Sequence, residues 1–108
     1  MIRVTVYKKE NEITGLRTEG HADYAEEGSD IYCAAVSALV INTMNSIERF
    51  TDDIFKEVVD EDRAVCDFRA AGTVSHDAEL LLQSLVYGLT DLSKDNEMYL
   101  SLSFEEVQ

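Results

Sequence analysis

The chain has 108 residues and carries 22 acidic against 9 basic side chains, so its formal net charge is −13. Its length predicts one domain over residues 1–108, and 45% hydrophobic with 29% charged residues is a globular composition rather than a disordered one. So acidic a chain is a poor candidate for direct nucleic-acid binding or for an anionic membrane surface, whereas a basic partner would be attracted to it.

The sequence shows no pattern of export or membrane insertion. Residues 1–6 enter an alternating strand pattern at once, without the architecture of a signal peptide. No apolar run approaches the roughly 18 residues of a membrane helix. Cys33 and Cys66 are too few for a disulfide framework. We therefore expect a cytoplasmic protein with reduced thiols.

The first two predicted elements form a β-hairpin. Residues 2–7 alternate between apolar and polar side chains, as in a strand with one buried face. A polar turn follows at residues 8–12. Residues 13–21 continue as a second strand, although two glycines weaken its alternation.

A polar loop at residues 22–30 leads into a long helix. The loop holds four carboxylates and one glycine, and Ser29 or Asp30 can cap the helix that follows. Residues 31–50 are apolar around most of the helical circumference. That distribution predicts a helix buried on nearly all sides.

The second half of the chain repeats the alternation of strands and helix. Residues 55–59 and 65–70 predict another strand pair, and Ser75 predicts the cap of a second helix with acidic residues in its first turn. Residues 98–104 alternate again and predict a last strand.

The predicted order is therefore β-β-α-β-β-α-β. The alternation of the first and last strands leaves one sheet face polar, so helices on the other face suffice. We expect an α+β fold, a two-layer sandwich of a five-stranded sheet and two helices. One helix on each face is the alternative, and strand order does not follow from the sequence.

One segment combines features used in thiol chemistry. His21 ends the second predicted strand, and Cys33 follows twelve residues later, in the first helical turn if Asp30 is the N-cap. The helix dipole and the unpaired amides there favour the reactive thiolate. A nearby imidazolium would favour it further and could protonate a leaving amine. Backbone amides at the same helix terminus could form an oxyanion hole.

Each of these residues also has a purely structural interpretation. A cysteine in an apolar helix is most often a small core residue, and a histidine at a strand end is more often a surface or capping residue. Asp30 can be a helix cap alone, and the loop carboxylates oppose thiolate formation. Spacing alone therefore makes a pair of Cys33 and His21 possible without requiring it.

Gly-His-Ala at residues 20–22, followed by Gly-Ser-Asp-Ile-Tyr-Cys-Ala-Ala-Val-Ser at residues 28–37, resembles the ribosomal-processing cysteine protease family, Prp. The resemblance is dense from residue 20 to residue 40, and the size and element layout extend it to essentially the whole chain. It implies a single cysteine protease domain that acts as a homodimer. The implied substrate is a basic ribosomal protein, the twenty-seventh of the bacterial large subunit, whose N-terminal extension is removed.

The same resemblance implies roles for individual residues. Cys33 would be the nucleophile and His21 the general base and acid. Asp30 stands at the family's aspartate and would orient His21. Ser37 matches the family's serine, one turn after Cys33, and would support the thiol or a neighbouring carbonyl. Tyr32 is bulkier than the residue expected there, which would affect the substrate groove. The cut is expected after a hydrophobic, Phe-rich stretch and before a small residue.

The loop at residues 22–30 is predicted to move. Tyr24 is almost its only large apolar anchor, so little offsets the entropy of ordering it. We expect it to be mobile in the free protein and to close over bound peptide, with Gly28 as the hinge. Closure would bring His21 to Cys33.

The remaining cysteine and histidine are not expected to take part in the chemistry. Cys66 has the strand parity of an inward core thiol, and His76 follows a helix cap. The four Cys and His residues match no compact zinc-ligand spacing, and the sequence contains no phosphate loop or dinucleotide fingerprint. No cofactor and no metal are therefore expected.

Two functions remain open at this point. The first is the cysteine endopeptidase, and the alternative is a non-catalytic acidic module that binds a basic ribosomal or assembly protein. Between Arg17 and Arg49 there are six acidic residues and no Lys or Arg, which would attract a basic partner in either case. Such charges are otherwise an ordinary solvated loop. Only the protease requires Cys33 and His21.

Overall fold

The computed structural model of the chain describes residues 1–20 and 29–108. These residues form five strands and two helices in the predicted order: β1 (Ile2–Lys9), β2 (Glu12–Glu19), α1 (Ser29–Phe50), β3 (Phe55–Asp60), β4 (Val65–Ala70), α2 (His76–Ser93) and β5 (Leu100–Glu106). Neither described helix is long and apolar enough to cross a membrane.

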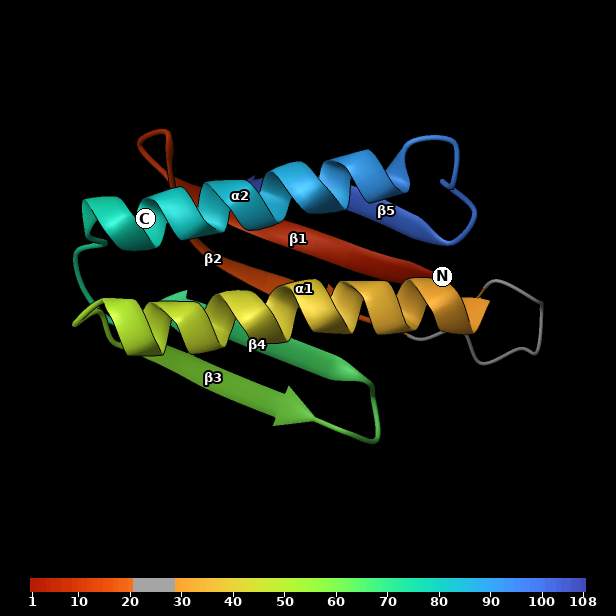
Figure 1. The fold of residues 1–108 in the computed structure, drawn as a ribbon, viewed down its shortest axis with the longest axis horizontal. Coiled ribbons are helices and arrows are strands. Elements are labelled where there is room, and N and C mark those ends of the chain that lie inside the picture. Colours follow the sequence, from red (N-terminus) through yellow and green to blue (C-terminus); the bar gives the residue numbers. More distant parts are fainter. Residues whose placement is uncertain (21–28) are drawn as a thin grey trace.

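The strands form one mixed sheet in the order β3-β4-β2-β1-β5. β1 pairs parallel with β5, and the other neighbours pair antiparallel. Both helices lie side by side on one face of the sheet (Figure 1). The predicted two-layer α+β sandwich is confirmed, and the alternative of one helix on each face is wrong. β3 forms one edge of the sheet, beside and beyond α1 in Figure 1.

The core lies between the sheet and the two helices. The predicted inward side chains of β1, namely Ile2, Val4 and Val6, are at most 4% exposed. Each buried aliphatic side chain of this size contributes about 1.5–3 kcal/mol relative to an exposed one. Burial of α1 on nearly all sides, as the sequence predicts, is wrong. Val40 is buried, but Ile41 is 57% exposed because only one face of α1 meets the sheet and α2.

The predicted cap of the second helix is confirmed. The Ser75 hydroxyl accepts a hydrogen bond from the Ala78 amide at 3.2 Å, and Asp77 and Glu79 occupy the first turn. The Glu79 carboxylate also accepts a hydrogen bond of 2.8 Å from the amide of Ile13. The start of α2 is thereby fixed to β2.

The last strand begins later than the alternation predicts. β5 starts at Leu100, and Met98 lies in the preceding turn with 68% of its surface exposed. The turn uses a left-handed backbone at Asp95, where φ is 62°, and the Tyr99 amide donates to the Asn96 carbonyl at 2.9 Å. Phe104 is 60% exposed despite its inward parity. Edge strand β5 therefore contributes less to the core than expected.

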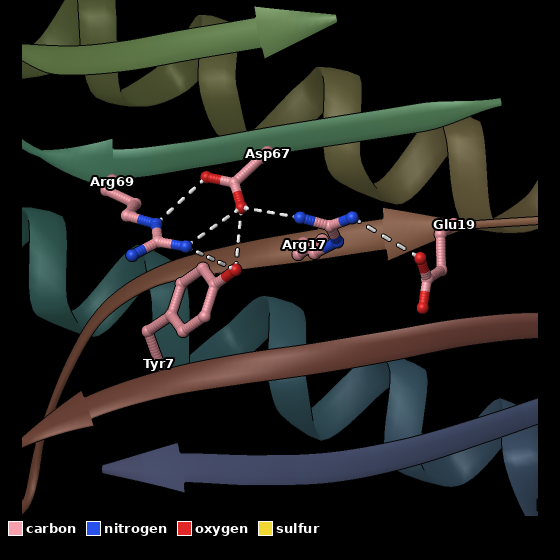
Figure 2. A network of polar contacts seen from close by, with 5 residues as sticks. All are labelled: Tyr7, Arg17, Glu19, Asp67 and Arg69. Atoms are coloured by element: carbon pink, nitrogen blue, oxygen red, sulfur yellow. Dashed lines mark hydrogen bonds and ion pairs between the residues drawn. The ribbon is translucent and has the colours of Figure 1, made fainter. Parts of the chain in front are cut away.

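The sheet face that carries no helix holds a polar network across three strands (Figure 2). The Tyr7 hydroxyl donates to the Asp67 carboxylate at 2.6 Å, and the Arg69 guanidinium donates to both. Arg17 lies 3.7 Å from the same carboxylate and 3.4 Å from Glu19. The Arg69 guanidinium also lies 4.0 Å from the centre of the Tyr7 ring. These contacts leave Tyr7 only 2% exposed on a face predicted to be polar.

Asp67→Asn is expected to destabilise the fold by about 1–3 kcal/mol at neutral pH, because two arginines and a phenol lose their shared anion. Burial alone would raise the pKa of Asp67, but hydrogen bonds from Arg69 and Tyr7 outweigh it and lower the pKa. The ionised carboxylate therefore stabilises the fold at neutral pH. That contribution is lost as the pH falls below the ordinary Asp value of about 4.

Urea unfolding at neutral pH and through the acidic range measures both effects. The wild type should lose more stability on acidification than Asp67→Asn. The control is Asp91→Asn, whose carboxylate pairs with Lys94 at an exposed site and should change stability by less than about 1 kcal/mol. Parallel pH profiles for wild type and Asp67→Asn would show that the network is neutral in stability.

Candidate functional site

Cys33 lies two residues further into its helix than predicted. Because α1 begins at Ser29, Cys33 is the fifth helical residue, and the expected cap at Asp30 is wrong since Asp30 lies inside the first turn. The helix dipole acts mainly within that first turn. Cys33 thus stands just after the strongest part of the dipole, half-buried and packed against the edge of the core.

Cys33 opens into a hollow of about 360 Å³ between α1 and the ends of β2, β3 and β4. Ser37, one turn further along α1, lines the same hollow, and so do Val59 and Cys66 on the strands. Gly20 forms part of its rim. A glycine is required there, because φ is 86° and a Cβ would meet the Met1 carbonyl oxygen at 2.4 Å. The chain therefore leaves β2 at the edge of the hollow.

The structure tests only part of the predicted site. It places Cys33 and Ser37 in one hollow. His21, Gly28 and the loop up to residue 28 lie outside the described residues. The pairing of His21 with Cys33, the role of Asp30 and the closure of the loop therefore stay predictions.

Cys66 is not the core thiol that its parity predicts. It lies on the inward face of β4 but is only half-buried, and it lines the hollow together with Cys33. Burial, with smaller contributions from the charges of Glu57 and Asp67, raises the pKa of the Cys66 thiol. At neutral pH Cys66 is therefore a protonated, weakly nucleophilic neighbour of Cys33.

At neutral pH, iodoacetamide is expected to alkylate Cys33 about tenfold or more faster than Cys66, because the thiolate is the species that reacts. Mass spectrometry of time-quenched samples separates the two sites. Raising the pH should narrow the difference as Cys66 ionises. Equal rates at neutral pH would contradict the assignment of the two thiols.

The hollow at Cys33 continues along the helix as a groove. A second hollow of about 350 Å³ shares Ser37, Val59 and Cys66 with the first, and a third of about 130 Å³ shares Met44 and Glu57 with the second. We call this continuous depression the α1–β3 groove. It is lined from the helix by Cys33, Val36, Ser37, Val40, Ile41, Met44 and Asn45, and from the strands by Thr18, Phe55, Glu57, Val59 and Cys66.

Tyr32 lies outside the described lining of this groove, and its predicted effect on the substrate groove stays a prediction. Its ring stacks on the ring of Tyr99, with centroids 5.0 Å apart and an interplanar angle of 11°. Tyr32 is absent from the groove lining, because consecutive residues of α1 point in different directions around the helix.

The walls of the α1–β3 groove are mainly apolar, and the charged side chains among its described lining residues are all acidic. Its ionisable lining residues among those the structure describes, other than cysteine, are Glu48, Glu57, Asp60 and Glu61. Within residues 1–20 and 29–108, no group of three or more His, Cys, Asp and Glu is arranged to hold a metal ion. The arrangement suits an extended peptide chain, with a thiol at one end of the groove.

Comparison with known proteins points to one family. A family model described as cysteine protease Prp matches residues 1–101. The ribosomal processing cysteine protease Prp of Staphylococcus aureus is 27% identical over 96 residues, which are 89% of this chain and 91% of that protein.

Two crystal structures of the S. aureus protease share the fold. The structure in complex with a covalently linked product peptide has a TM-score of 0.86 at 27% identity, over 97% of this chain and 100% of that one. The structure in complex with a substrate peptide has a TM-score of 0.89 at 25% identity, with the same coverage.

Proposed function

Because the chain belongs to the Prp cysteine protease family, we propose that it removes the N-terminal extension of the twenty-seventh protein of the bacterial large ribosomal subunit. Cys33 acts as the nucleophile and His21 as its general base and acid. The observation that carries this proposal is the position of Cys33 at the end of an open groove, in a chain matched almost throughout by the family. The relatives named ribosomal processing proteases support the substrate class.

The reaction proceeds through two acyl-transfer steps. His21 takes the thiol proton of Cys33, whose sulfur attacks the scissile carbonyl carbon, and the charge on the oxygen is stabilised by backbone amides of the first turn of α1. His21 protonates the leaving amine, so the peptide bond breaks and a thioester remains on Cys33. His21 then takes a proton from water, which attacks the thioester and releases the acid product.

Two further residues assist this chemistry. Asp30 orients the imidazole of His21 from the first turn of α1. Ser37 is exposed and lines both larger hollows of the groove, so its hydroxyl is placed to hydrogen-bond a carbonyl of the peptide or support the thiol. Gly28 serves as the hinge of the loop that brings His21 to Cys33.

The cellular setting follows from the same proposal. The protein acts as a homodimer in the cytoplasm, where a thiol nucleophile stays reduced. It needs no cofactor and engages neither nucleic acid nor a membrane. Its acidic surface, with a net charge of −13, speeds encounter with a basic ribosomal protein.

The test uses the purified protein and the extended ribosomal protein from the same genome. Intact mass spectrometry should show one cut, after a hydrophobic stretch and before a small residue. Binding of the ribosomal protein without any cut would overturn the proposed reaction. That result would support the alternative function, a non-catalytic acidic module that binds a basic protein.

A further inference from the structure

We propose that the α1–β3 groove selects peptides in which apolar side chains flank a basic one, and that Glu57 is the residue that recognises the basic side chain. This inference rests on the proposed function, because the groove affects cleavage only if Cys33 is the nucleophile. It adds a specificity residue and a defined position in the substrate.

The length of the groove sets how much peptide it holds. Cys33 and Met44 are eleven residues apart on α1, and both line the groove. A helix rises about 1.5 Å per residue, so the two side chains lie about 16 Å apart along the axis. An extended peptide advances about 3.3 Å per residue, so this distance accommodates about five residues next to the scissile bond.

The walls of the groove define what those residues are. Val40, Ile41 and Met44 supply apolar surface from the helix, and Val59 supplies it from the strand. Ile41 and Val59 are 57% and 54% exposed although they are large and apolar. A bound peptide with apolar side chains would cover this surface, at about 25 cal/mol for each Å² removed from water.

The basic residues that lie near the groove in the sequence do not line it. Among the described residues, the charged groups of the groove are all carboxylates. Four of the nine basic residues of the chain instead line a hollow on the opposite face, together with Asp60 and Asp67: Arg17, Lys56, Arg63 and Arg69. The groove therefore attracts a cationic peptide although its walls are mainly apolar.

Glu57 is the groove carboxylate best placed to bind a basic side chain of the peptide. It lies on β3 between Phe55 and Val59 and lines both hollows remote from Cys33. Its backbone pairs with β4, but its side chain makes no hydrogen bond or ion pair with any residue that the structure describes. Met44 lines the same two hollows, and an apolar neighbour strengthens an ion pair by excluding water.

The spacing of Glu57 and Val59 along β3 sets the position of the basic side chain in the bound peptide. Val59 lines the hollow of Cys33, and Glu57 precedes it by two residues, which is about 7 Å along the strand. An extended peptide advances by two residues over that distance. The basic side chain therefore stands two positions further from the scissile bond than the side chain that contacts Val59.

The experiment compares cleavage of a positional library of fluorogenic decapeptides in which each position is Lys, Gln or Glu. Wild-type protein should prefer Lys at one position within five residues of the cut. Glu57→Lys should reverse that preference, with kcat/KM for the Lys peptide falling about tenfold and that for the Glu peptide rising. Glu57→Gln should abolish the preference.

The matched control is Glu105→Lys on β5, an exposed carboxylate at the opposite edge of the same sheet. It makes the same change of charge and should keep the wild-type preference. An unchanged preference in Glu57→Lys, or an equal loss in Glu105→Lys, would overturn the assignment of Glu57.

Peptide binding to Cys33→Ala protein separates this inference from the proposed function. Fluorescence anisotropy should show tighter binding of the Lys peptide than of the Glu peptide, and Glu57→Lys in the same background should reverse the order. Cleavage by wild type without any charge preference would overturn the groove inference but would not contradict the proposed protease function. Charge-selective binding without cleavage would support the groove and overturn the proposed reaction.

Discussion

Replacing Cys33 by Ala should lower the rate of peptide cleavage by at least about 10⁴-fold, because it removes the sulfur on which the acyl intermediate forms. The fold should survive, since Cys33 lies half-buried at the edge of the core and α1 accommodates alanine readily. Steady-state kinetics with a fluorogenic peptide measures the rate, and circular dichroism monitors the fold.

Cys66→Ala is the matched control, because it removes the second thiol of the same hollow. Its activity should stay within a few-fold of wild type, while the small cavity costs roughly 1 kcal/mol of stability. Near-normal cleavage by Cys33→Ala would exclude Cys33 as the nucleophile. Loss of activity in Cys66→Ala at normal stability would identify Cys66 on β4 as the nucleophile.

His21→Ala should lower the rate of cleavage by about 10²–10⁴-fold, the usual contribution of general acid–base catalysis. Its imidazolium protonates the leaving amine, so the variant should also lose the alkaline limb of the pH profile. A full profile of kcat/KM against pH measures both effects.

His76→Ala provides the control for His21. The side chain of His76 is 87% exposed at the start of α2, and its imidazole pairs with the neighbouring Asp77 carboxylate. This variant should keep the wild-type rate and profile. A His21→Ala variant with an unchanged rate and profile would assign His21 a structural role and place the base elsewhere.

Local patterns predicted the elements well because each pattern has a local cause. The apolar residues Ile2, Val4 and Val6 at alternate positions indicate a strand with one buried face. Ser75, followed by the acidic residues Asp77 and Glu79, indicates the start of a helix. Strand order has no such local signature. The parallel pairing of β1 with β5 joins the two ends of the chain, and no spacing within either strand encodes it.

The errors at the site have equally specific causes. The helix begins two residues earlier than an Asp30 cap implies, which places Cys33 outside the first turn. Cys66 was assigned to the core by parity, but parity gives only the face of a strand. Its burial depends on how far α1 covers β4, a tertiary property.

The sequence did not predict the α1–β3 groove, because the exposure of its strand residues is also a tertiary property. Glu57 and Val59 share the inward parity of buried strand residues, but β3 is an edge strand and both side chains remain exposed. The sequence did carry one signal, a carboxylate at an inward position beside an apolar residue. An acidic residue there favours a strand whose inward face is open to solvent.

Labelling with a peptide chloromethyl ketone tests the central claim most directly, because the reagent alkylates the thiol that attacks the scissile carbonyl. Cys33 and Cys66 line one hollow, yet they fall in different tryptic fragments, residues 18–49 and 64–69. Tandem mass spectrometry should find a single adduct, on Cys33, that appears in step with loss of activity. An adduct on Cys66, or complete inactivation with Cys33 unmodified, would contradict Cys33 as the nucleophile.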